Sequence, residues 1–497
     1  MNYSNKKFVK HLLILMLCLV FSSSFSQTVN QLGVYQIGTD ADKLSENAIF
    51  VQKVSPYRIL TAHNSNKTDI TVMAYLSTND GASWSFDAES GWCDPTVIIT
   101  NNSCFYLSMI ESGYYTQINV KCDVDWNGIP PSGPGDDKPF FWYDNVNDII
   151  YYSVRNGNTF KIYKLTSNGF IEIYQTTQNS NSKVPVPGDP SIRIKTDNNG
   201  CIYAVINNGS RVYFTRTLSN DCIPSDNVFN FIDPIEISTS TNLNWPHESA
   251  TIAVNGNGSE ILIAYTTEVG SDLNTVIRRS SDYGESFQDV SSGLPTTGKQ
   301  FHPWLSYCTN GSIDLYSFVY YNRDGTNRVS VSYTTNYGSS WSTQNVATTA
   351  STFGEGGSSP DYIGLDMVYK NNLFYVYPVF SDYPNSQWKS YIAPFTLNYN
   401  NNEDDNAIVN KGLKLFQNNP NPFNPVTKIK FSLDKPGNAS LKVYNLLGEL
   451  VNTVTDTYMN SGEHSFTFDG SNLASGIYYY ILESNNTKVV KKMLLIK

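Results

Sequence analysis

The chain has 497 residues, of which 16% are charged and 13% aromatic, and its formal net charge at pH 7 is −10. An acidic balance of this kind argues against nucleic acid and anionic membranes as partners, because both repel a negative surface. The length allows more than one domain.

The first 26 residues predict a signal peptide. Three Lys lie within the first ten residues, and residues 11–21 form an apolar core that is too short to span a bilayer. Small residues precede the expected cleavage site before Gln27, and removing the three Lys would take the net charge from −10 to −13. No later stretch has the length and apolar character of a transmembrane helix. We therefore expect a secreted or surface-attached protein.

Residues 27–397 predict an all-β domain. Apolar and polar residues alternate with period two, for example in residues 70–75 and 328–333, and no window sustains a period of 3.6. Ser, Thr, Asn and Gly separate these short runs, which is typical of turns.

An eight-residue pattern recurs inside this domain. It reads Ser or Thr first, Asp or Asn third, Gly fifth and Trp or Phe eighth, in residues 77–84, 280–287 and 334–341, with a weaker copy at 153–160. The third side chain can accept hydrogen bonds from its own turn, Gly supplies a positive φ, and the aromatic residue packs beside the next strand. The pattern resembles the Asp box, or BNR repeat, of sialidases and other β-propellers. The resemblance implies a propeller, with the boxes in a structural role away from the active face.

A second repeat sets the number of units. Short, mostly acid-led segments recur at steps of 43 to 59 residues and open the expected first strand of each unit. Each step is long enough for one four-stranded blade. These openings are Glu46, Asp94, Asp137, Asp189, Glu248, His302 and Asp361.

The last unit has room for three strands, so we predict that a strand at residues 32–37 completes it. That gives a seven-bladed β-propeller, with six blades as the alternative if the short unit from Asp94 to Asp136 is partly absorbed by its neighbours.

Six Cys remain after cleavage, and export permits disulfides. Cys104 and Cys201 each begin a second strand, and Cys122 and Cys222 each follow a third strand. Because these strands are antiparallel neighbours, we expect Cys104–Cys122 and Cys201–Cys222, each stabilising by about 3 kcal/mol. Cys93 and Cys308 are left without a predicted partner.

The openings of the first strands define the candidate ligand site. In a propeller they would ring one mouth of the central channel, joined by Trp92, Trp245 and Trp304. The acids are suited to binding Ca²⁺ or to acid–base chemistry on a glycosidic bond, or they cap turns. The Trp side chains would stack on sugars or pack between blades.

A calcium site is a further candidate. Asp123, Asp125 and Asn127 alternate and are followed by Gly128, which resembles the front half of a calcium loop. Pro134 stands where an EF-hand has Glu, so the alternative is a polar turn. No other cofactor is indicated.

The sialidase resemblance does not extend to the catalytic residues. Sialidases hold a carboxylate with three Arg, the first in an Arg-Ile-Pro motif, and use a Tyr–Glu pair and an Asp. Arg58 is followed by Ile and Leu, and it should open a second strand, far from the channel mouth. The remaining candidates share no register: Arg193, Arg211, Arg278 and Arg323. The resemblance therefore carries fold but not activity.

Residues 398–411 are polar and acidic and predict a linker to a C-terminal domain at residues 412–497. That domain contains Asn419-Pro-Asn-Pro-Phe-Asn-Pro425, then alternating strands, and ends in Lys491-Lys-Met-Leu-Leu-Ile-Lys497. It resembles the type A C-terminal sorting domain of the type IX secretion system. The resemblance implies a small Ig-like β-sandwich, recognised by the outer-membrane machinery and often removed after export.

The leading hypothesis is a secreted or surface-attached propeller that binds, and in one version processes, extracellular glycans or glycoproteins. The first alternative is a non-catalytic propeller for adhesion or protein interaction. The second is a sialidase-like glycoside hydrolase whose Arg residues come from loops. Convergence of three Arg over a Tyr–Glu pair would distinguish this hydrolase from a binding protein.

Overall fold

The computed structural model describes two compact units, residues 25–400 and 401–497. All paired strands in both units are antiparallel, and the single helical element described is a 3-10 turn, Pro384–Ser386. The described residues are 25–39, 41–65, 71–91, 93–111, 115–122, 127–129, 136–156, 159–177, 191–208, 211–218, 222–238, 250–269, 272–296, 298–349, 363–401, 413–416, 418, 420–433, 435–445, 449–484 and 487–497.

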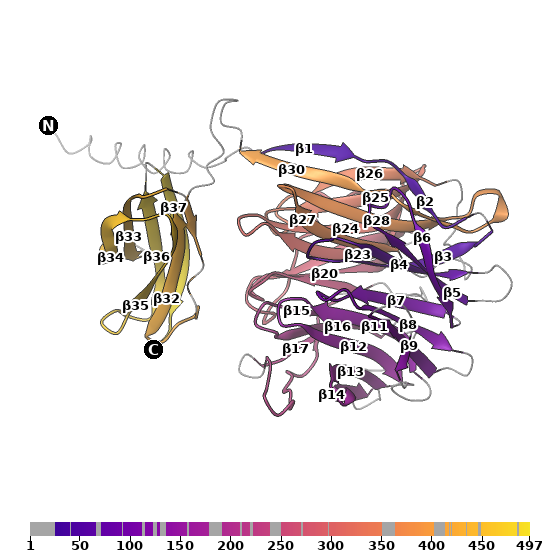
Figure 1. Ribbon diagram of the computed structural model, residues 1–497, viewed down its shortest axis with the longest axis horizontal. Helices are drawn as coiled ribbons and strands as arrows, with labels where there is room; N and C mark the ends of the chain where they lie inside the picture. The colour runs from indigo at the N-terminus through magenta and orange to yellow at the C-terminus, as the bar shows by residue number, and fades with distance from the viewer. Residues whose placement is uncertain are drawn as a thin grey trace. The chain divides into compact units, whose positions relative to one another are not determined.

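Six sheets of the first unit have four strands each, and their strands follow the order of the chain across each sheet (Figure 1). The first three sheets are β3 (Leu44–Val51), β4 (Ile59–Ser65), β5 (Thr71–Ser77) and β6 (Ser85–Ser90); β7 (Cys93–Ile99), β8 (Phe105–Glu111), β9 (Tyr115–Lys121) and β10 (Asn127–Ile129); and β11 (Asp136–Asp144), β12 (Ile149–Asn156), β13 (Thr159–Thr166) and β14 (Gly169–Thr177). The next three are β15 (Ser191–Thr196), β16 (Ile202–Asn207), β17 (Val212–Arg216) and β18 (Ile235–Glu236); β19 (Thr251–Val254), β20 (Ile261–Val269), β21 (Asp272–Ser280) and β22 (Gln288–Asp289); and β23 (Lys299–Thr309), β24 (Asp314–Arg323), β25 (Asn327–Thr334) and β26 (Ser342–Thr348).

The seventh sheet joins the two ends of the unit. It contains β27 (Gly364–Lys370), β28 (Leu373–Asp382), β29 (Lys389–Ile392), β30 (Phe395–Asn401), β1 (Phe25–Gln31) and β2 (Tyr35–Ile37). The N-terminal strand β2 pairs with β29, and β1 pairs with β30, alongside which it runs in Figure 1. The prediction that a strand near residues 32–37 completes the last sheet is confirmed by this pairing.

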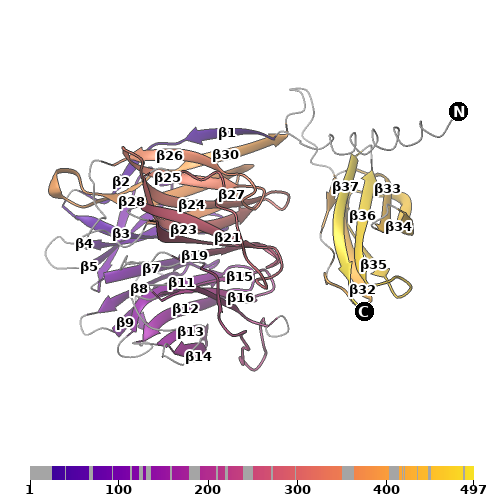
Figure 2. The ribbon, with the colours of Figure 1, turned by 180° about the vertical axis from the view of Figure 1, so that it is seen from behind.

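The seven sheets form a closed ring. The first strands contact one another in the cycle β3, β7, β11, β15, β19, β23, β27 and back to β3. Figure 2 shows the stacked sheets from behind. Apolar clusters fill the spaces between neighbouring sheets, including the space between the first sheet and the seventh, where Ile49 and Val51 meet Val368 and Val379. The core is therefore divided among the sheet interfaces, and the first strands surround a common channel.

A β-bulge recurs near the start of four first strands. Glu46, Asp94, Lys138 and His302 all have φ between 49° and 54°, and each lies at a register shift. In three of the four, Pro follows the bulged residue, and because Pro lacks an N–H it interrupts the ladder at that point.

The position of the bulge in β11 corrects the predicted register of this strand by one residue. The bulged position in β11 is Lys138, whereas Asp137 lies one residue earlier and pairs with Arg155 of β12. Lys138-Pro139 is the equivalent of Asp94-Pro95, so a base occupies a ring position that we expected to be acidic.

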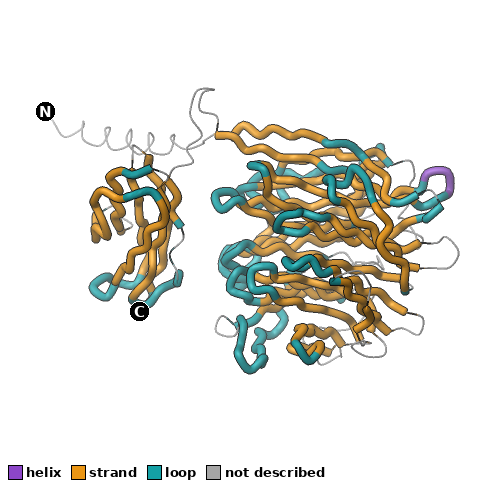
Figure 3. The backbone as a smooth tube through the Cα atoms, viewed as in Figure 1, coloured by secondary structure: helices purple, strands orange, loops and turns teal. Residues whose placement is uncertain are grey.

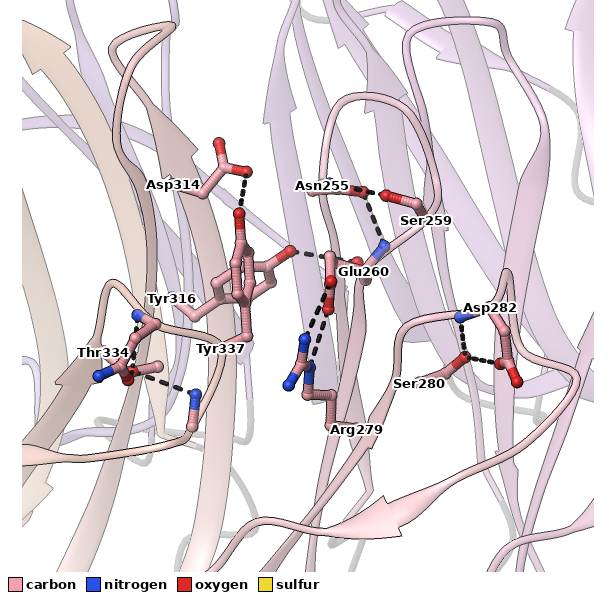
Figure 4. A network of polar contacts seen from close by, with 12 residues as sticks. Asn255, Ser259, Glu260, Arg279, Ser280, Asp282, Asp314, Tyr316, Thr334 and Tyr337 are labelled. Carbon is pink, nitrogen blue, oxygen red and sulfur yellow. Dashed lines mark hydrogen bonds and ion pairs between the residues drawn. The ribbon is translucent and has the colours of Figure 1, made fainter. Parts of the chain in front are cut away.

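The three strong octapeptides form the same turn between third and fourth strands. Asn79, Asp282 and Asn336 each accept a backbone hydrogen bond from the Ser four residues later, at 3.0 Å in all three turns. Each also accepts the hydroxyl of the residue two positions earlier, and that hydroxyl accepts the N–H of the turn glycine. Figure 4 shows Ser280 and Asp282 of one turn and Thr334 of another.

The aromatic residue that ends two of these turns packs on the preceding sheet. Trp341 donates from Nε1 to the carbonyl of Val290 at 2.8 Å, and the ring of Phe287 lies 5.1 Å from that of Phe214 in β17. The weaker copy at residues 153–160 is different, because residues 153–156 remain paired in β12 and Phe160 lies in β13. It therefore joins second and third strands and does not form this turn.

Both expected disulfides are present. Cys104–Cys122 links the start of β8 to the end of β9, and Cys201–Cys222 links the start of β16 to the segment after β17. Cys93 and Cys308 are half-buried and are not joined in a disulfide.

The second unit is a two-sheet sandwich, and like the first it is almost entirely strand and loop (Figure 3). In β32 the side chains alternate between buried and exposed, so Ile429, Phe431 and Leu433 enter the core together with Leu441 and Leu482 of the facing sheet. The two sheets are β31 (Leu413–Leu415), β32 (Val426–Leu433) and β35 (Gly462–Asp469), and β34 (Leu450–Met459), β33 (Gly437–Asn445), β36 (Gly476–Ser484) and β37 (Thr487–Leu495).

Candidate functional site in the channel

The channel is constricted by two rings and a guanidinium. Phe140 of β11 and Trp304 of β23 lie with their ring centroids 6.0 Å apart, and the Arg193 guanidinium carbon of β15 lies 4.9 Å from the first ring and 5.0 Å from the second. Arg193 is only 4% exposed. The cavity at this level measures about 40 Å³, which is room for a few water molecules at most.

A larger cavity lies beyond the constriction, where the first strands end. Its volume is about 430 Å³, within the range of small-molecule binding sites. Aromatic and charged side chains line it together, among them Lys53, Trp142, Lys195, Tyr307, Asp366 and Tyr369.

The carboxylate of Asp366 in β27, at one side of this cavity, forms an ion pair and hydrogen bonds with neighbouring protein groups. Its carboxylate accepts the Lys53 ammonium at 2.6 Å, the backbone N–H of Val51 at 2.7 Å and the Ser306 hydroxyl at 3.4 Å. Lys53 also donates to the carbonyl of Met367 at 2.8 Å. The ion pair between Lys53 and Asp366 joins the first sheet to the seventh and therefore helps to close the ring.

Lys195 of β15 lies on the other side. Its Nζ is 3.7 Å from the centroid of Trp142, whose Nε1 donates to the Thr196 hydroxyl at 2.9 Å. Lys195 forms no hydrogen bond or ion pair with the residues that the structure describes. Burial lowers the pKa of Lys195 to about 7; the charge of Asp366 works against this shift, and those of Lys53 and Arg193 work with it.

The strand pattern explains why these side chains meet. In β15, Ile192 and Ile194 pack in an apolar cluster with Phe160 and Ile162 of the neighbouring sheet, so Arg193 and Lys195 lie on the other face. There Arg193 lines the smaller cavity and Lys195 lines both. The alternation of Ile with a basic residue in a first strand was a signal for an internal basic site, and we missed it in the sequence. Nothing comparable marked Asp366 or Trp142.

The sequence-predicted site residues are only partly brought together. Asp94 lines the smaller cavity and pairs with Lys138 at 3.5 Å, and Trp304 forms part of the constriction. Glu46 accepts a hydrogen bond from Asn64, and His302 is buried against Phe301. The others lie outside the described residues: Asp189, Glu248, Asp361, Trp92 and Trp245.

The calcium candidate lies largely outside the described residues too. Asp123 and Asp125 are not described, and Asn127 begins β10, where it pairs with Val120. Within the described ranges, no cluster of three or more His, Cys, Asp or Glu could hold a metal ion.

The five Arg considered for a sialidase-like triad do not converge. Arg193 is the one that lines a channel cavity, the smaller of the two. Arg211 pairs with Glu236 at 2.7 Å, and Arg278 lies 3.9 Å from Asp289. Arg58 and Arg323 lie over the rings of Phe105 and Phe301.

The architecture defines an all-β protein with an internal channel and a C-terminal sandwich. Residues 419–497 match the protein family described as the secretion system C-terminal sorting domain, which indicates a protein that is secreted or held at the outer-membrane surface. No helix in the described part of the chain is long and apolar enough to cross a membrane.

No curated protein matches the chain. Among solved structures, it is similar to a mutant α-L-arabinofuranosidase from Fusarium graminearum bound to an iminosugar (10% identity over 73% of this chain and 97% of that chain, TM-score 0.41). It is also similar to a polysaccharide lyase of family PL25, an ulvan lyase (11% identity, 72% and 95%, TM-score 0.46), and to the lectin SapL1 with α-methyl fucoside (10% identity, 62% and 98%, TM-score 0.39).

Proposed function

We propose that residues 27–397 form a seven-bladed β-propeller of the Asp-box type that binds extracellular glycans in its channel. The seven sheets in a closed cycle and the three equivalent octapeptide turns support the fold assignment. In this proposal residues 1–26 are a signal peptide, 398–411 a linker and 412–497 an Ig-like sorting domain read by the type IX machinery.

The observation that carries the binding function is the cavity of about 430 Å³ beside Trp142. It combines aromatic surface with hydrogen-bonding and charged groups, as sites for sugars require, because a sugar ring has both apolar faces and hydroxyl groups. The half-buried Trp142 is anchored by its hydrogen bond to Thr196, so its ring is a fixed surface.

The carboxylates that line the cavities favour binding over hydrolysis, because they are held in ion pairs. Glycosidases of the usual kind need two carboxyl groups flanking one bond, one of them free to donate a proton. Among the described residues that line the two cavities, the carboxylates are Asp94 and Asp366, and each lies in an ion pair with Lys138 or Lys53. The separated Arg residues likewise give no support to a sialidase-like site.

The test is a glycan-array screen of the purified chain, scoring bound glycan and released sugar. We expect binding without release, and a loss of about tenfold or more in affinity for Trp142→Ala, in line with the loss of an aromatic contact. Trp388→Ala is the matched control, because Trp388 packs on Tyr383 and lines neither cavity. Equal binding by the wild type and Trp142→Ala would place the ligand elsewhere, and released sugar would make the protein an enzyme.

A further inference from the structure

The large cavity carries more positive than negative charge, although the chain as a whole is acidic. Lys53 and Lys195 line it, and Asp366 is the one acid among its described lining residues. Lys53 and Asp366 neutralise each other at 2.6 Å, which leaves Lys195 as an ammonium without a counter-ion among the described residues. A single excess cation in a chain of net charge −10 indicates an interior tuned to attract an anion.

The position of Lys195 suits a ligand better than a structural partner. Its Nζ is held over Trp142 by a cation–π contact, and the cavity that it lines is large enough for a sugar unit. A buried charge without a partner is costly, which is why burial lowers the pKa of Lys195, and a ligand that supplies the opposite charge would remove this cost.

We infer that the cavity selects glycans bearing an acidic group, a uronate carboxylate or a sulfate ester, which the Lys195 ammonium binds beside Trp142. This inference rests on the proposed glycan-binding function and names its ligand class. Trp142 supplies the aromatic contact and Lys195 the charge.

The inference makes binding dependent on pH. The charged and titratable groups around Lys195 are Arg193 on its own strand and, from the other strands, Lys53, Asp366, Cys308, Tyr307 and Tyr369. Because the pKa of Lys195 is near 7, the competent ammonium form declines as pH rises above 7. Carboxylates and sulfates stay ionised there, so the apparent Kd should rise by about tenfold between pH 6 and pH 8.

Titration calorimetry with the full chain tests this inference. The probes are an oligogalacturonate, its methyl ester as the uncharged counterpart, and a sulfated galactan oligosaccharide, each at pH 6 and pH 8. The variants are Lys195→Met, Lys195→Arg to restore the charge, and Lys164→Met as a control, since Lys164 lies on β13, lines neither cavity and donates to Asn227. Thermal unfolding verifies that each variant is folded.

The expected result is that at least one acidic probe binds tenfold or more tightly than the ester. Lys195→Met should abolish that preference and Lys195→Arg should retain it, and comparing the carboxylated with the sulfated probe identifies the group. If the ester binds as well as the acids and Lys195→Met changes nothing, the inference is wrong while glycan binding stands. If no probe binds and the glycan array is also silent, both proposals fail.

Discussion

The rings of Phe140 and Trp304 meet 6.0 Å apart across the channel, although β11 and β23 belong to sheets that are not neighbours in the ring. Contacts across a channel of this kind tie together sheets that otherwise touch only through the sheets between them. The Arg193 guanidinium lies within 5.0 Å of both rings, so three side chains from three sheets meet at this point. The constriction therefore stabilises the ring and separates the two cavities.

Removal of the Trp304 ring should destabilise the first unit. Trp304→Ala leaves a cavity and removes both the aromatic contact and the cation–π contact with Arg193, so we expect a loss of about 3 kcal/mol. Trp304→Phe should lose about half as much, because it keeps a ring. Urea unfolding measures both. An unfolding free energy unchanged in Trp304→Ala would show that the contact does not hold the ring together.

The turn at Asp282 should tolerate Asn but not Ala. Asn79 and Asn336 fill the same place in the other two turns, so Asp282→Asn should cost less than about 0.5 kcal/mol. Asp282→Ala leaves the donors of Ser280 and Ser286 without their acceptor, and we expect a cost of about 1–2 kcal/mol.

Wild type and Asp282→Asn should also differ in how much stability they lose in acid. Burial by itself would raise the pKa of Asp282, but hydrogen bonds from Ser286 and Ser280 outweigh it and lower the pKa below its usual value. The stability due to Asp282 is therefore present above the unfolded pKa of about 4 and is lost as pH falls further. Urea unfolding at pH 7 and pH 3 should show a smaller acid loss in Asp282→Asn. The idea fails if wild type and Asp282→Asn lose equal stability.

His63 should make the first unit sensitive to mild acid. It is fully buried in β4 and donates from Nδ1 to Asn47 at 2.9 Å, and Asn47 in turn donates to Ser381 of the seventh sheet at 2.8 Å. Burial lowers the pKa of His63 to about 3. Between pH 6.5 and pH 3 the unfolded chain binds a proton that the folded chain does not, so stability falls as pH falls.

The slope of that loss is at most about 1.4 kcal/mol per pH unit for one proton. His63→Gln keeps a hydrogen-bond donor for Asn47 but cannot ionise, so its stability should depend less on pH between 7 and 4. Melting temperatures of both proteins across this range provide the comparison. Identical slopes would exclude His63 as the titrating group.

Each disulfide should contribute by restricting the unfolded chain. The bridges close separations of 18 and 21 residues, for which the chain-entropy model gives about 3 kcal/mol each. The double variant Cys104→Ala with Cys122→Ala, and the matching pair at Cys201 and Cys222, should each lower the unfolding free energy by about this amount. With all four replaced, a reducing agent should have no further effect, and a large further effect would point to a role for Cys93 or Cys308.

Much of the fold follows from local patterns in the sequence. The β2 strand could be predicted because the last unit has too few residues for four strands, and the disulfides because second and third strands are antiparallel neighbours. The octapeptide turns could be recognised because all their hydrogen bonds lie within five residues. These turn bonds do not depend on the rest of the fold.

The site could not be predicted in the same way. Trp142 and Lys195 come from neighbouring sheets, and the closure of the ring brings Asp366 of the seventh sheet to the same cavity. The one-residue error at Asp137 has a local cause, since the bulged residue is the one directly before Pro139, which is Lys138 and not the acid. The sequence placed the ligand at the end where the first strands begin, whereas the cavity beside Trp142 and Lys195 lies where they end.

The pairing of Ile37 with Ser390 has a consequence for how the protein is made. The strand β2 and its partner β29 lie near opposite ends of the unit in the sequence. For this reason β2 has no partner until nearly all of the unit has been synthesised. Contacts this distant along the chain slow folding, and until they form β29 and β30 are open edges that can pair with other chains. A chain truncated before β29 would therefore be an open arc of sheets with exposed edge strands, prone to association, and not a smaller ring.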